Sequence, residues 1–519
     1  MHSFDFVIVG AGAAGCVVAS RLAARFPQAD ILLVEAGADR RGLINAIPLL
    51  SGFAPFRRGL NWMHPASHAG RQTLLYQGRM LGGSSELNGM VVSRGCVDDY
   101  SNWQDAAGDA WSFERCLAAF RRLDRYEGGV SAQHGGDGPM SVRRVQPYGP
   151  LPEAFISAAG EAGFPVVDDL NGATGARFGL TDINTLNGKR HSARSAFLQA
   201  VPSNLTLLTG YEARRMELTS GHAKTLVISR DGRDETVEIR SEIILAGGAI
   251  GTTALLFKSG IGPRDNLLAA RIDPVIPHSE VGANLQNHPS YLLRVPTHGG
   301  SMSGLLSPFK AIGAGLQWLS SRSGPLAQGL FHAAGYFPVE DSDDIAGAQV
   351  VMSPALFPTA APGKRPSMPR QHGASFAIQQ GSPFSRGRVA LRADGSLSIE
   401  TGALSDRRDV EFMEAAVARV QGILAQPAFR RHVSDLSIFQ QISGDEIRKS
   451  IGTAYHMAGT ARMGMDEGAV TDERLRVRGV AGLRIADASI MPLIPNAALH
   501  FPTMMIAERA AEFLSEDWS

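Results

Sequence analysis

The chain has 519 residues and a mass of 55.2 kDa, more than one hydrophobic core usually serves, which predicts roughly two or three domains. Fifty lysines and arginines balance fifty aspartates and glutamates, so the sequence offers no electrostatic footprint for nucleic acid or an anionic membrane surface. With 44% hydrophobic and 19% charged residues, the composition is that of a globular protein whose substrate is small and neutral.

Cysteine usage and the N-terminal segment predict the compartment. Cys16, Cys96 and Cys116 have spacings that fit neither a disulfide framework nor a structural zinc site. Residues 1–12, MHSFDFVIVGAG, enter a strand at once, without a basic leader or a cleavage site. No apolar run reaches the ~18 residues that a membrane helix needs. We therefore expect a cytoplasmic protein with no membrane span and no nucleic-acid partner.

The first local pattern in the chain is a strand, a glycine-rich turn and a helix, in the segment DFVIVGAGAAGCVVASRLAARF. In its Gly-x-Gly-x-x-Gly pattern, Gly10 permits a tight turn, Gly12 lets a pyrophosphate approach the backbone, and Gly15 packs the helix on the strand. A second strand, ADILLVEAG, reaches Glu35 at the spacing of about 20 residues expected of a carboxylate that binds a ribose hydroxyl. Glu35 disfavours a 2′-phosphate, so the pattern allows NAD and FAD and does not choose between them.

The choice follows from the segment YQGRMLGGSSELNGMVVSRG, Tyr76 to Gly95. A double glycine followed by two serines presents backbone N–H groups and hydroxyls that suit a phosphate or the edge of a ring. Here the sequence resembles the glucose-methanol-choline (GMC) oxidoreductase family of flavoenzymes. The first signature of that family, Gly-Arg-x-Leu-Gly-Gly-Ser-Ser-x-x-Asn, is matched from Gly78 to Asn88.

The resemblance extends over nearly the whole chain. The stretch Ala246 to Gly262 is similar to the second family signature, and VGANLQNHP follows, with Asn287 where the family usually has Asp. Leu475 to Pro492 and Pro502 to Leu514 are similar to the C-terminal flavin-binding block. The resemblance implies FAD as the cofactor.

A fold is implied as well. It is an α/β protein in which a Rossmann-type FAD-binding domain is interleaved with an α+β substrate-binding domain, a mixed sheet backed by helices. We expect the FAD-binding domain at residues 1–150, 200–290 and 445–519, and the substrate-binding domain at 151–199 and 291–444.

Family members that attach the flavin covalently through histidine carry it just before the asparagine that matches Asn88. This chain has Leu87 there, so we expect non-covalent FAD. The residues expected to bind it are Gly10, Gly12, Ala13, Ala14, Gly15, Glu35, Ala36, Trp62, Arg79, Gly82, Gly83, Ser84, Asn88, Gly89, Met90, Val91, Ala213, Ala246, Gly247, Asp487, Ala488, His500, Phe501, Pro502 and Met505.

Two histidines are the candidate catalytic residues. A single histidine in a mostly apolar stretch such as TAYHMAGTARMG is more often structural than catalytic. In the family, however, His-x-x-Gly-Thr-x-x-Met-Gly supplies a histidine that faces the flavin, and His456 to Gly464 matches it. A second polar group, Asn or His in the family, lies just before the Pro-Thr-x-Met step. His500 stands there, with Asn496 as a rival and a plain structural histidine as the remaining interpretation.

Alcohol oxidation explains why two such groups are needed. Hydride moves from the carbinol carbon to flavin N5, and the hydroxyl proton needs a base whose pKa lies near neutrality. A second imidazole can orient the oxygen. We expect His456 to be the base and His500 to position the alcohol, although the sequence does not decide between them. No Cys, Asp or Glu lies at a metal-ligand interval near either histidine, so no metal is expected.

The substrate is less defined. QGRMLGGSS, HMAGTAR and ADASIMP are similar to bacterial members that oxidise aryl or furanic primary alcohols, such as aryl-alcohol and hydroxymethylfurfural oxidases. Candidates for the pocket lining, or for ordinary core, are Phe331, His332, Phe357 and Phe376. Oxygen and a quinone both remain as electron acceptors. A quinone-linked dehydrogenase of a non-aromatic alcohol, a cyanohydrin lyase and a structural or photochemical flavoprotein are the alternatives.

Overall fold

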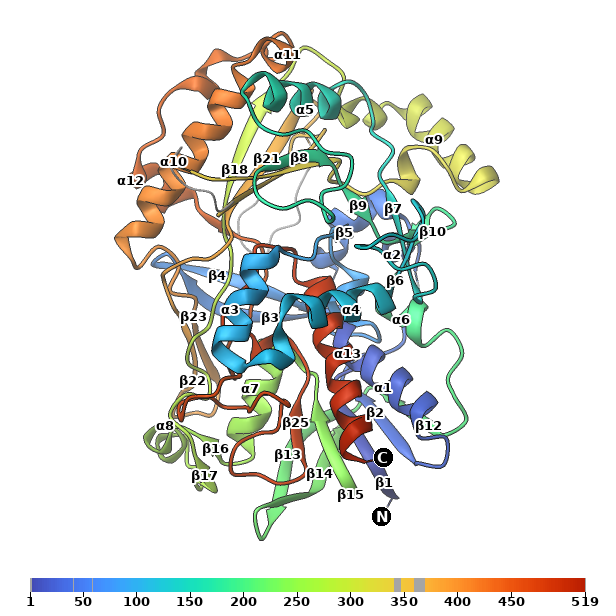
Figure 1. The fold of residues 1–519 in the computed structure, drawn as a ribbon, viewed down its shortest axis with the longest axis vertical. Coiled ribbons are helices and arrows are strands. Elements are labelled where there is room, and N and C mark those ends of the chain that lie inside the picture. The colour runs from blue at the N-terminus through green and yellow to red at the C-terminus, as the bar shows by residue number, and fades with distance from the viewer. Residues whose placement is uncertain (1, 41, 58, 340–346, 359–368, 519) are drawn as a thin grey trace.

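The computed structural model describes residues 2–40, 42–57, 59–339, 347–358 and 369–518. Two lobes are stacked along the long axis of the molecule (Figure 1). One lobe contains a seven-stranded sheet and both chain termini, and the other contains a six-stranded sheet. The predicted α/β fold class is confirmed.

The seven-stranded sheet forms the floor of the first lobe. Its order is β12 (Leu205–Thr209), β2 (Ile31–Glu35), β1 (His2–Val9), β15 (Arg233–Leu245), β14 (His222–Arg230) and β13 (Glu212–Thr219), with β25 (Leu483–Ile485) beside β15. The first four of these strands and β25 run parallel, β14 pairs antiparallel with β15, and β13 pairs antiparallel with β14. Strand β2 is buried along its whole length, as expected for a parallel strand covered on both faces.

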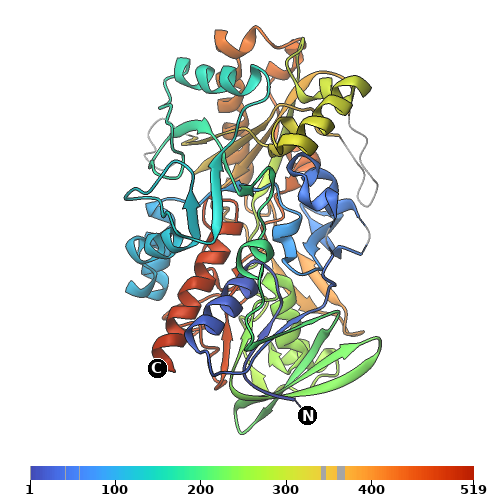
Figure 2. The same cartoon turned by 90° about the vertical axis from the view of Figure 1, so that its right-hand side faces the viewer.

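Helices cover this sheet. Figures 1 and 2 show α1 (Ala13–Arg25) and the C-terminal helix α13 (His500–Asp517) side by side. Helix α7 (Gly248–Lys258) packs against β13. Because α1 starts directly after β1 and α7 directly after β15, both helix N-termini lie at the carboxyl edge of parallel strands, where α/β folds bind ligands.

The six-stranded sheet forms the core of the second lobe. Its order is β24 (Gly452–Thr453), β18 (Pro289–Pro296), β21 (Gly373–Gln380), β20 (Ala348–Ser353), β19 (Ala333–Phe337) and β8 (Arg177–Leu180). Every pairing in it is antiparallel, which refines the expectation of a mixed sheet. One face carries Leu293, Met352 and Phe376 into a core shared with α5 (Leu151–Glu161) and α10 (Arg407–Leu424).

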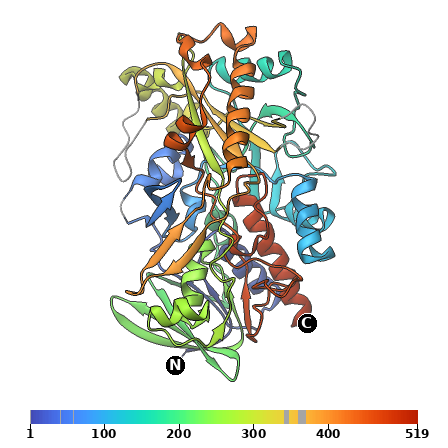
Figure 3. The same ribbon diagram turned by 90° about the vertical axis from the view of Figure 1, so that its left-hand side faces the viewer.

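A four-stranded sheet flanks both lobes. It joins the hairpin β3 (Asn61–His68) and β4 (Arg71–Gly78) to β22 (Arg388–Leu391) and β23 (Leu397–Glu400), through Ser67 and Glu400. Figure 3 shows the two hairpins in orange and blue along one side of the molecule. The other α-helices of the described residues are α2 (Leu43–Ala46), α3 (Val97–Ala107), α4 (Phe113–Leu123), α6 (Ala193–Phe197), α8 (Arg264–Ala269), α9 (Pro308–Ser321), α11 (Pro427–Arg430) and α12 (Gly444–Ser450). The small strands are β5 (Val91–Val92), β6 (Asp124–Tyr126), β7 (Met140–Arg144), β9 (Asp182–Ile183), β10 (Thr185–Leu186), β11 (Lys189–Arg190), β16 (Ile261–Gly262) and β17 (Ile276–Pro277).

The strands can be compared with the predicted domain ranges. All strands of the seven-stranded sheet lie in the ranges expected for the FAD-binding domain. Strand β24 lies in the range 445–519 yet joins the six-stranded sheet, and β22 and β23 lie in 291–444 yet pair with β3. The chain therefore crosses between the lobes several times, and the domain limits stay a prediction.

Cys16, Cys96 and Cys116 are free thiols. Among the described residues, the longest helices are too short or too polar to cross a membrane.

The turn between β1 and α1 depends on two glycines. Gly10 has φ of 99°, a left-handed conformation that glycine adopts without strain. A Cβ on Gly15 would lie 1.8 Å from the carbonyl oxygen of Gly10, whereas a Cβ on Gly12 would meet nothing within 4 Å. Gly15 is therefore needed for packing, and Gly12 leaves open space above the helix N-terminus.

Replacing Gly15 with alanine should destabilise the apoprotein by about 1–3 kcal/mol, because the added methyl overpacks the strand–helix contact. Gly12→Ala is the matched control, since its methyl enters open space, and it should change the free energy of unfolding much less. Urea unfolding of both apoproteins measures the difference. Equal destabilisation by the two variants would contradict this account of the turn.

Candidate active site

A cavity of about 1430 Å³ lies between the two lobes. It extends from the glycine turn after β1, past the loop that follows β4, to one face of the six-stranded sheet. Among the described residues, no group of three or more His, Cys, Asp or Glu is arranged to hold a metal ion.

Most residues expected to bind the cofactor line this cavity. They are Gly10, Gly12, Ala13, Ala14, Glu35, Ala36, Trp62, Gly83, Ser84, Asn88, Gly89, Met90, Val91, Ala213, Ala246, Gly247, Asp487, Ala488 and His500. The cavity does not reach the remaining six, which are Gly15, Arg79, Gly82, Phe501, Pro502 and Met505. These six lie behind the lining and support it.

The supporting residues act through packing and backbone contacts. The guanidinium of Arg79 stacks over the ring of Trp62 at 4.4 Å. The N–H of Gly82 donates to the carbonyl of Ala11 at 2.8 Å and so ties the loop to the glycine turn. Phe501 is fully buried in the core of the first lobe.

Two buried carboxyl groups line the cavity near the glycine turn that follows β1. Glu35 accepts hydrogen bonds from the N–H groups of Ala11 (3.0 Å) and Gly37 (2.7 Å), and burial raises its pKa to about 7. Asp487 accepts from the N–H of Gly248 at 2.8 Å, and burial raises the pKa of that carboxyl as well. Both acids fix backbone turns at helix N-termini.

These features fit FAD. The open space above Gly12 suits a pyrophosphate, because free N–H groups and the helix dipole favour an anion at that place. Ser84 is exposed toward the cavity in the loop that follows β4. The guanidinium of Arg190 donates to Asn88 Oδ1 at 2.6 Å and to the carbonyl of Ser85 at 3.1 Å, which holds this loop in one conformation.

His500 begins α13 and lines the cavity. Both of its ring nitrogens are buried, and neither has a hydrogen-bond partner among the described residues. Burial, together with the charge of Arg190, lowers its pKa to about 3, so the ring is neutral. A neutral imidazole with two unpaired nitrogens can offer one donor and one acceptor to a bound molecule.

His456 lies on the loop after β24, half-buried, with its ring in the cavity lining. Its Nδ1 is 2.8 Å from Nδ1 of His288, and Nε2 of His288 is 3.0 Å from the carbonyl oxygen of Gly381. A carbonyl only accepts, so we assign the hydrogen of His288 to Nε2 and a lone pair to its Nδ1. His456 then donates through Nδ1, and its Nε2 carries a lone pair.

Burial keeps both of these rings neutral. His288 is fully buried, and burial lowers its pKa to about 4. The pKa of His456 is lowered well below 6.5, first by burial and then by the neighbouring His288. At neutral pH, His456 therefore offers an unprotonated Nε2.

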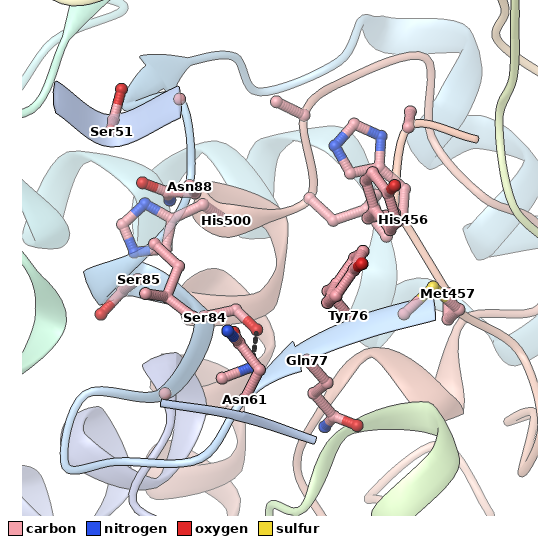
Figure 4. A pocket seen from close by; sticks show the side chains of 18 of the residues that line it. Ser51, Asn61, Tyr76, Gln77, Ser84, Ser85, Asn88, His456, Met457 and His500 are labelled. Carbon is pink, nitrogen blue, oxygen red and sulfur yellow. Dashed lines mark hydrogen bonds between the residues drawn. The ribbon is translucent and has the colours of Figure 1, made fainter. Parts of the chain in front are cut away.

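Figure 4 shows His456 and His500 on different sides of the cavity, with Tyr76 on the side of His456 and Asn88 beside His500. Among the described residues, no hydrogen bond or ring contact joins the two histidines. The same cavity therefore contains both candidate histidines, which lie on different sides of it.

Sequence reasoning missed His288. It belongs to the quoted segment VGANLQNHP, but nothing in its local pattern signals a partner 168 residues away. Sequence reasoning also missed Tyr455, whose ring centroid lies 5.7 Å from that of Tyr76. Both contacts arise from pairing between distant segments.

Comparison with known proteins identifies the family of the chain. Residues 4–290 match the N-terminal model of the GMC oxidoreductases, and residues 383–507 match the C-terminal model. The chain is 32% identical to an oxygen-dependent choline dehydrogenase of Vibrio vulnificus, over 98% of this chain and 94% of that protein.

Solved structures give the same result. Pyridoxine 4-oxidase from Mesorbium loti has a TM-score of 0.86 at 28% identity, with 98% of each chain covered. A fungal aryl-alcohol oxidase shares the fold, with a TM-score of 0.85 at 20% identity over the full length of both chains. The chain therefore belongs to the GMC oxidoreductase family and is an FAD-dependent enzyme that acts on CH–OH groups.

Proposed function

We propose that the chain oxidises a primary alcohol, an aryl or heteroaryl CH2OH compound, to the aldehyde with non-covalently bound FAD. The observation that supports this most is the hydrogen-bonded pair His456–His288, which leaves an unprotonated Nε2 at the cavity wall. Such a nitrogen suits a base that takes a hydroxyl proton. Leu87, which lines the cavity beside Asn88, provides no atom for a covalent flavin link.

When bound, FAD supplies the acceptor for the hydride that leaves the carbinol carbon. Nε2 of His456 accepts the hydroxyl proton of the alcohol. The protonated ring can keep donating through Nδ1 to His288, so the orientation of His456 does not change with its charge. Its low pKa makes His456 a weak base toward a resting alcohol, so proton transfer is favoured as the carbonyl forms.

His500 positions the alcohol in this proposal. Its two ring nitrogens have no protein partner, so a hydroxyl oxygen and a neighbouring acceptor or donor can satisfy them. The base role falls to His456 because its Nδ1 is hydrogen-bonded to His288, which fixes the ring and its tautomer, whereas no described residue binds either ring nitrogen of His500. This difference in anchoring is the reason for assigning the two roles as we do.

Aromatic rings in the cavity lining support an aromatic substrate. Phe331 and Phe357 line the cavity with their centroids 5.7 Å apart and their planes nearly perpendicular. An aryl ring can pack on such faces and edges. The other two candidates lie elsewhere. His332 accepts from the N–H of Tyr148, and Phe376 packs in the core on the opposite face of the sheet.

An anaerobic titration with 4-methoxybenzyl alcohol or hydroxymethylfurfural should bleach the flavin absorbance near ~450 nm. His456→Ala should slow bleaching by roughly 10²-fold or more, because the base is lost. Replacement of the exposed His222 by alanine is the control and should leave the rate unchanged. Readmission of air then separates the acceptors, since fast recovery of colour identifies oxygen and slow recovery favours a quinone.

Bleaching at the wild-type rate in His456→Ala would contradict the assignment of the base. A flavin that stays oxidised with every primary alcohol, but with turnover of a cyanohydrin, would identify a lyase instead.

Replacing His288 with leucine should lower kcat by about 10-fold or more, because His456 loses the acceptor that orients its ring. The wild-type pH profile of kcat/KM should stay flat from neutral pH down past 6.5, since His456 protonates only well below that value. In His288→Leu the acid limb should move to higher pH, because the neighbour that lowers the pKa of His456 is gone. His288→Asn keeps an acceptor oxygen and should recover much of kcat.

Steady-state pH profiles of both variants measure these effects. An unmoved acid limb together with wild-type kcat in His288→Leu would exclude His288 as a positioning residue.

A further inference from the structure

The far end of the cavity contains an arginine that the proposed chemistry does not use. Along β18, Ser290, Leu292 and Arg294 line the cavity, while Leu293 and Val295 point into the core on the other face. This alternation follows from the two-residue period of a strand. Arg294 therefore presents its guanidinium to the substrate half of the cavity.

This guanidinium has no partner in the described part of the chain. Among the residues that the structure describes, no hydrogen bond, ion pair or stacked ring involves Arg294, and its buried Nε is unsatisfied. The side chain is half-buried, and of its three nitrogens only Nε is among the buried unsatisfied atoms, so Nη1 and Nη2 remain accessible to a bound molecule. The side chain is therefore available for a charge-assisted pair with a ligand.

The acids of the cavity lie elsewhere. The described lining contains three, Glu35, Glu212 and Asp487, and all three belong to the first lobe and already have partners. The lining contributed by β18, β20, β21 and the 3-10 helix Met302–Leu306 contains no Asp or Glu. Counted over the described residues, the lining of the substrate half consequently carries a net positive charge.

The position of Arg294 fits the far end of an aromatic substrate. Ser290 pairs with Gly452 of β24, which leads into the loop of His456, so this end of β18 is the catalytic end. Arg294 is four residues further on, about 13 Å along the strand. The side chain of Arg294 covers part of this distance along β18. The remaining distance leaves room for a substituted aromatic ring.

Along this path lies Gln379, which pairs with Ser290 and has a buried, unpartnered Oε1 in the cavity lining. Polar groups thus occur at both ends of the channel, with the aromatic rings of Phe331 and Phe357 also in the lining.

We propose that the substrate is an aromatic alcohol that carries an anionic group, a carboxylate in the simplest case, opposite its CH2OH. The alcohol lies at His456, and the carboxylate pairs with Arg294. This inference rests on the proposed alcohol oxidation and names its substrate class. It also argues against choline, the substrate named for the Vibrio vulnificus relative, because a quaternary ammonium would face an unpaired cation and no free carboxylate.

Comparing 4-(hydroxymethyl)benzoate with its methyl ester tests the proposal. The holoenzyme should prefer the acid, and Arg294→Gln should lower kcat/KM for the acid by about 10- to 100-fold, mainly through KM, because a charge-assisted bond is lost. The same variant should leave the ester unchanged. Arg294→Lys, which keeps the charge without the planar fork, should fall between the two. Lys310→Gln, which removes a nearby exposed cation of α9, is the matched control.

Binding supplies a readout that does not depend on turnover. Calorimetry should detect terephthalate binding to the wild-type holoenzyme and to Lys310→Gln, with about 10-fold or greater loss in Arg294→Gln. Equal kcat/KM for acid and ester, or terephthalate affinity unchanged in Arg294→Gln, would overturn the carboxylate site while leaving alcohol oxidation intact. If no primary alcohol bleaches the flavin but terephthalate binding still requires Arg294, the proposed oxidation fails and the anion site stands.

Discussion

The active site depends on the pairing of two chain segments that lie about 170 residues apart. Gln286 and Ala458 form an antiparallel bridge with backbone bonds of 2.9 and 3.0 Å, and Pro289 and Ser290 continue the pairing against β24. The bridge carries His288 and His456 into contact. The backbone N–H of His456 also donates to Oδ1 of Asn287 at 2.9 Å, which fixes the loop from which the ring projects.

His288 and His456 are neutral because burial lowers the pKa of both rings. His288 is held by the carbonyl of Gly381, a group that cannot take a proton, so the pair has no exit for a proton on its buried side. A proton taken up at Nε2 of His456 can leave only toward the cavity. The low-polarity surroundings that lower both pKa values therefore also restrict proton transfer to the side of His456 that faces the cavity.

Much of the fold and of the cofactor site could be predicted from the sequence because the signals are local. The spacing of Gly10, Gly12 and Gly15 predicts a turn, space for a ligand and a packing contact within six residues, and the structure shows the turn, the open space and the contact. The family signatures also extend over contiguous stretches. Phe501 is buried and is not part of the cavity lining, a distinction that sequence adjacency to His500 does not reveal, and its contact with the cofactor stays a prediction.

The contacts that sequence could not supply are those set by sheet register. His288 meets His456 through the bridge between their segments, and Arg294 reaches the cavity because of the register in which β18 pairs with β21 and β24. The overall balance of charges predicted a neutral substrate, yet it averages over the surface and says nothing about one unpaired guanidinium in a cavity. Net charge from composition therefore bears on which partners the whole surface can bind, whereas strand register determines which charged side chains face a pocket.

The central claim is that His456 is neutral, protonated at Nδ1 and unprotonated at Nε2. Nitrogen-15 NMR of histidine-labelled holoenzyme at neutral pH tests it, because protonated and bare imidazole nitrogens have well-separated chemical shifts and the His288→Leu variant assigns the pair. The account predicts a protonated Nδ1 and a bare Nε2 for His456, with the opposite tautomer, protonated only at Nε2, absent. A His456 ring that carries its hydrogen at Nε2, or at both nitrogens, would contradict it.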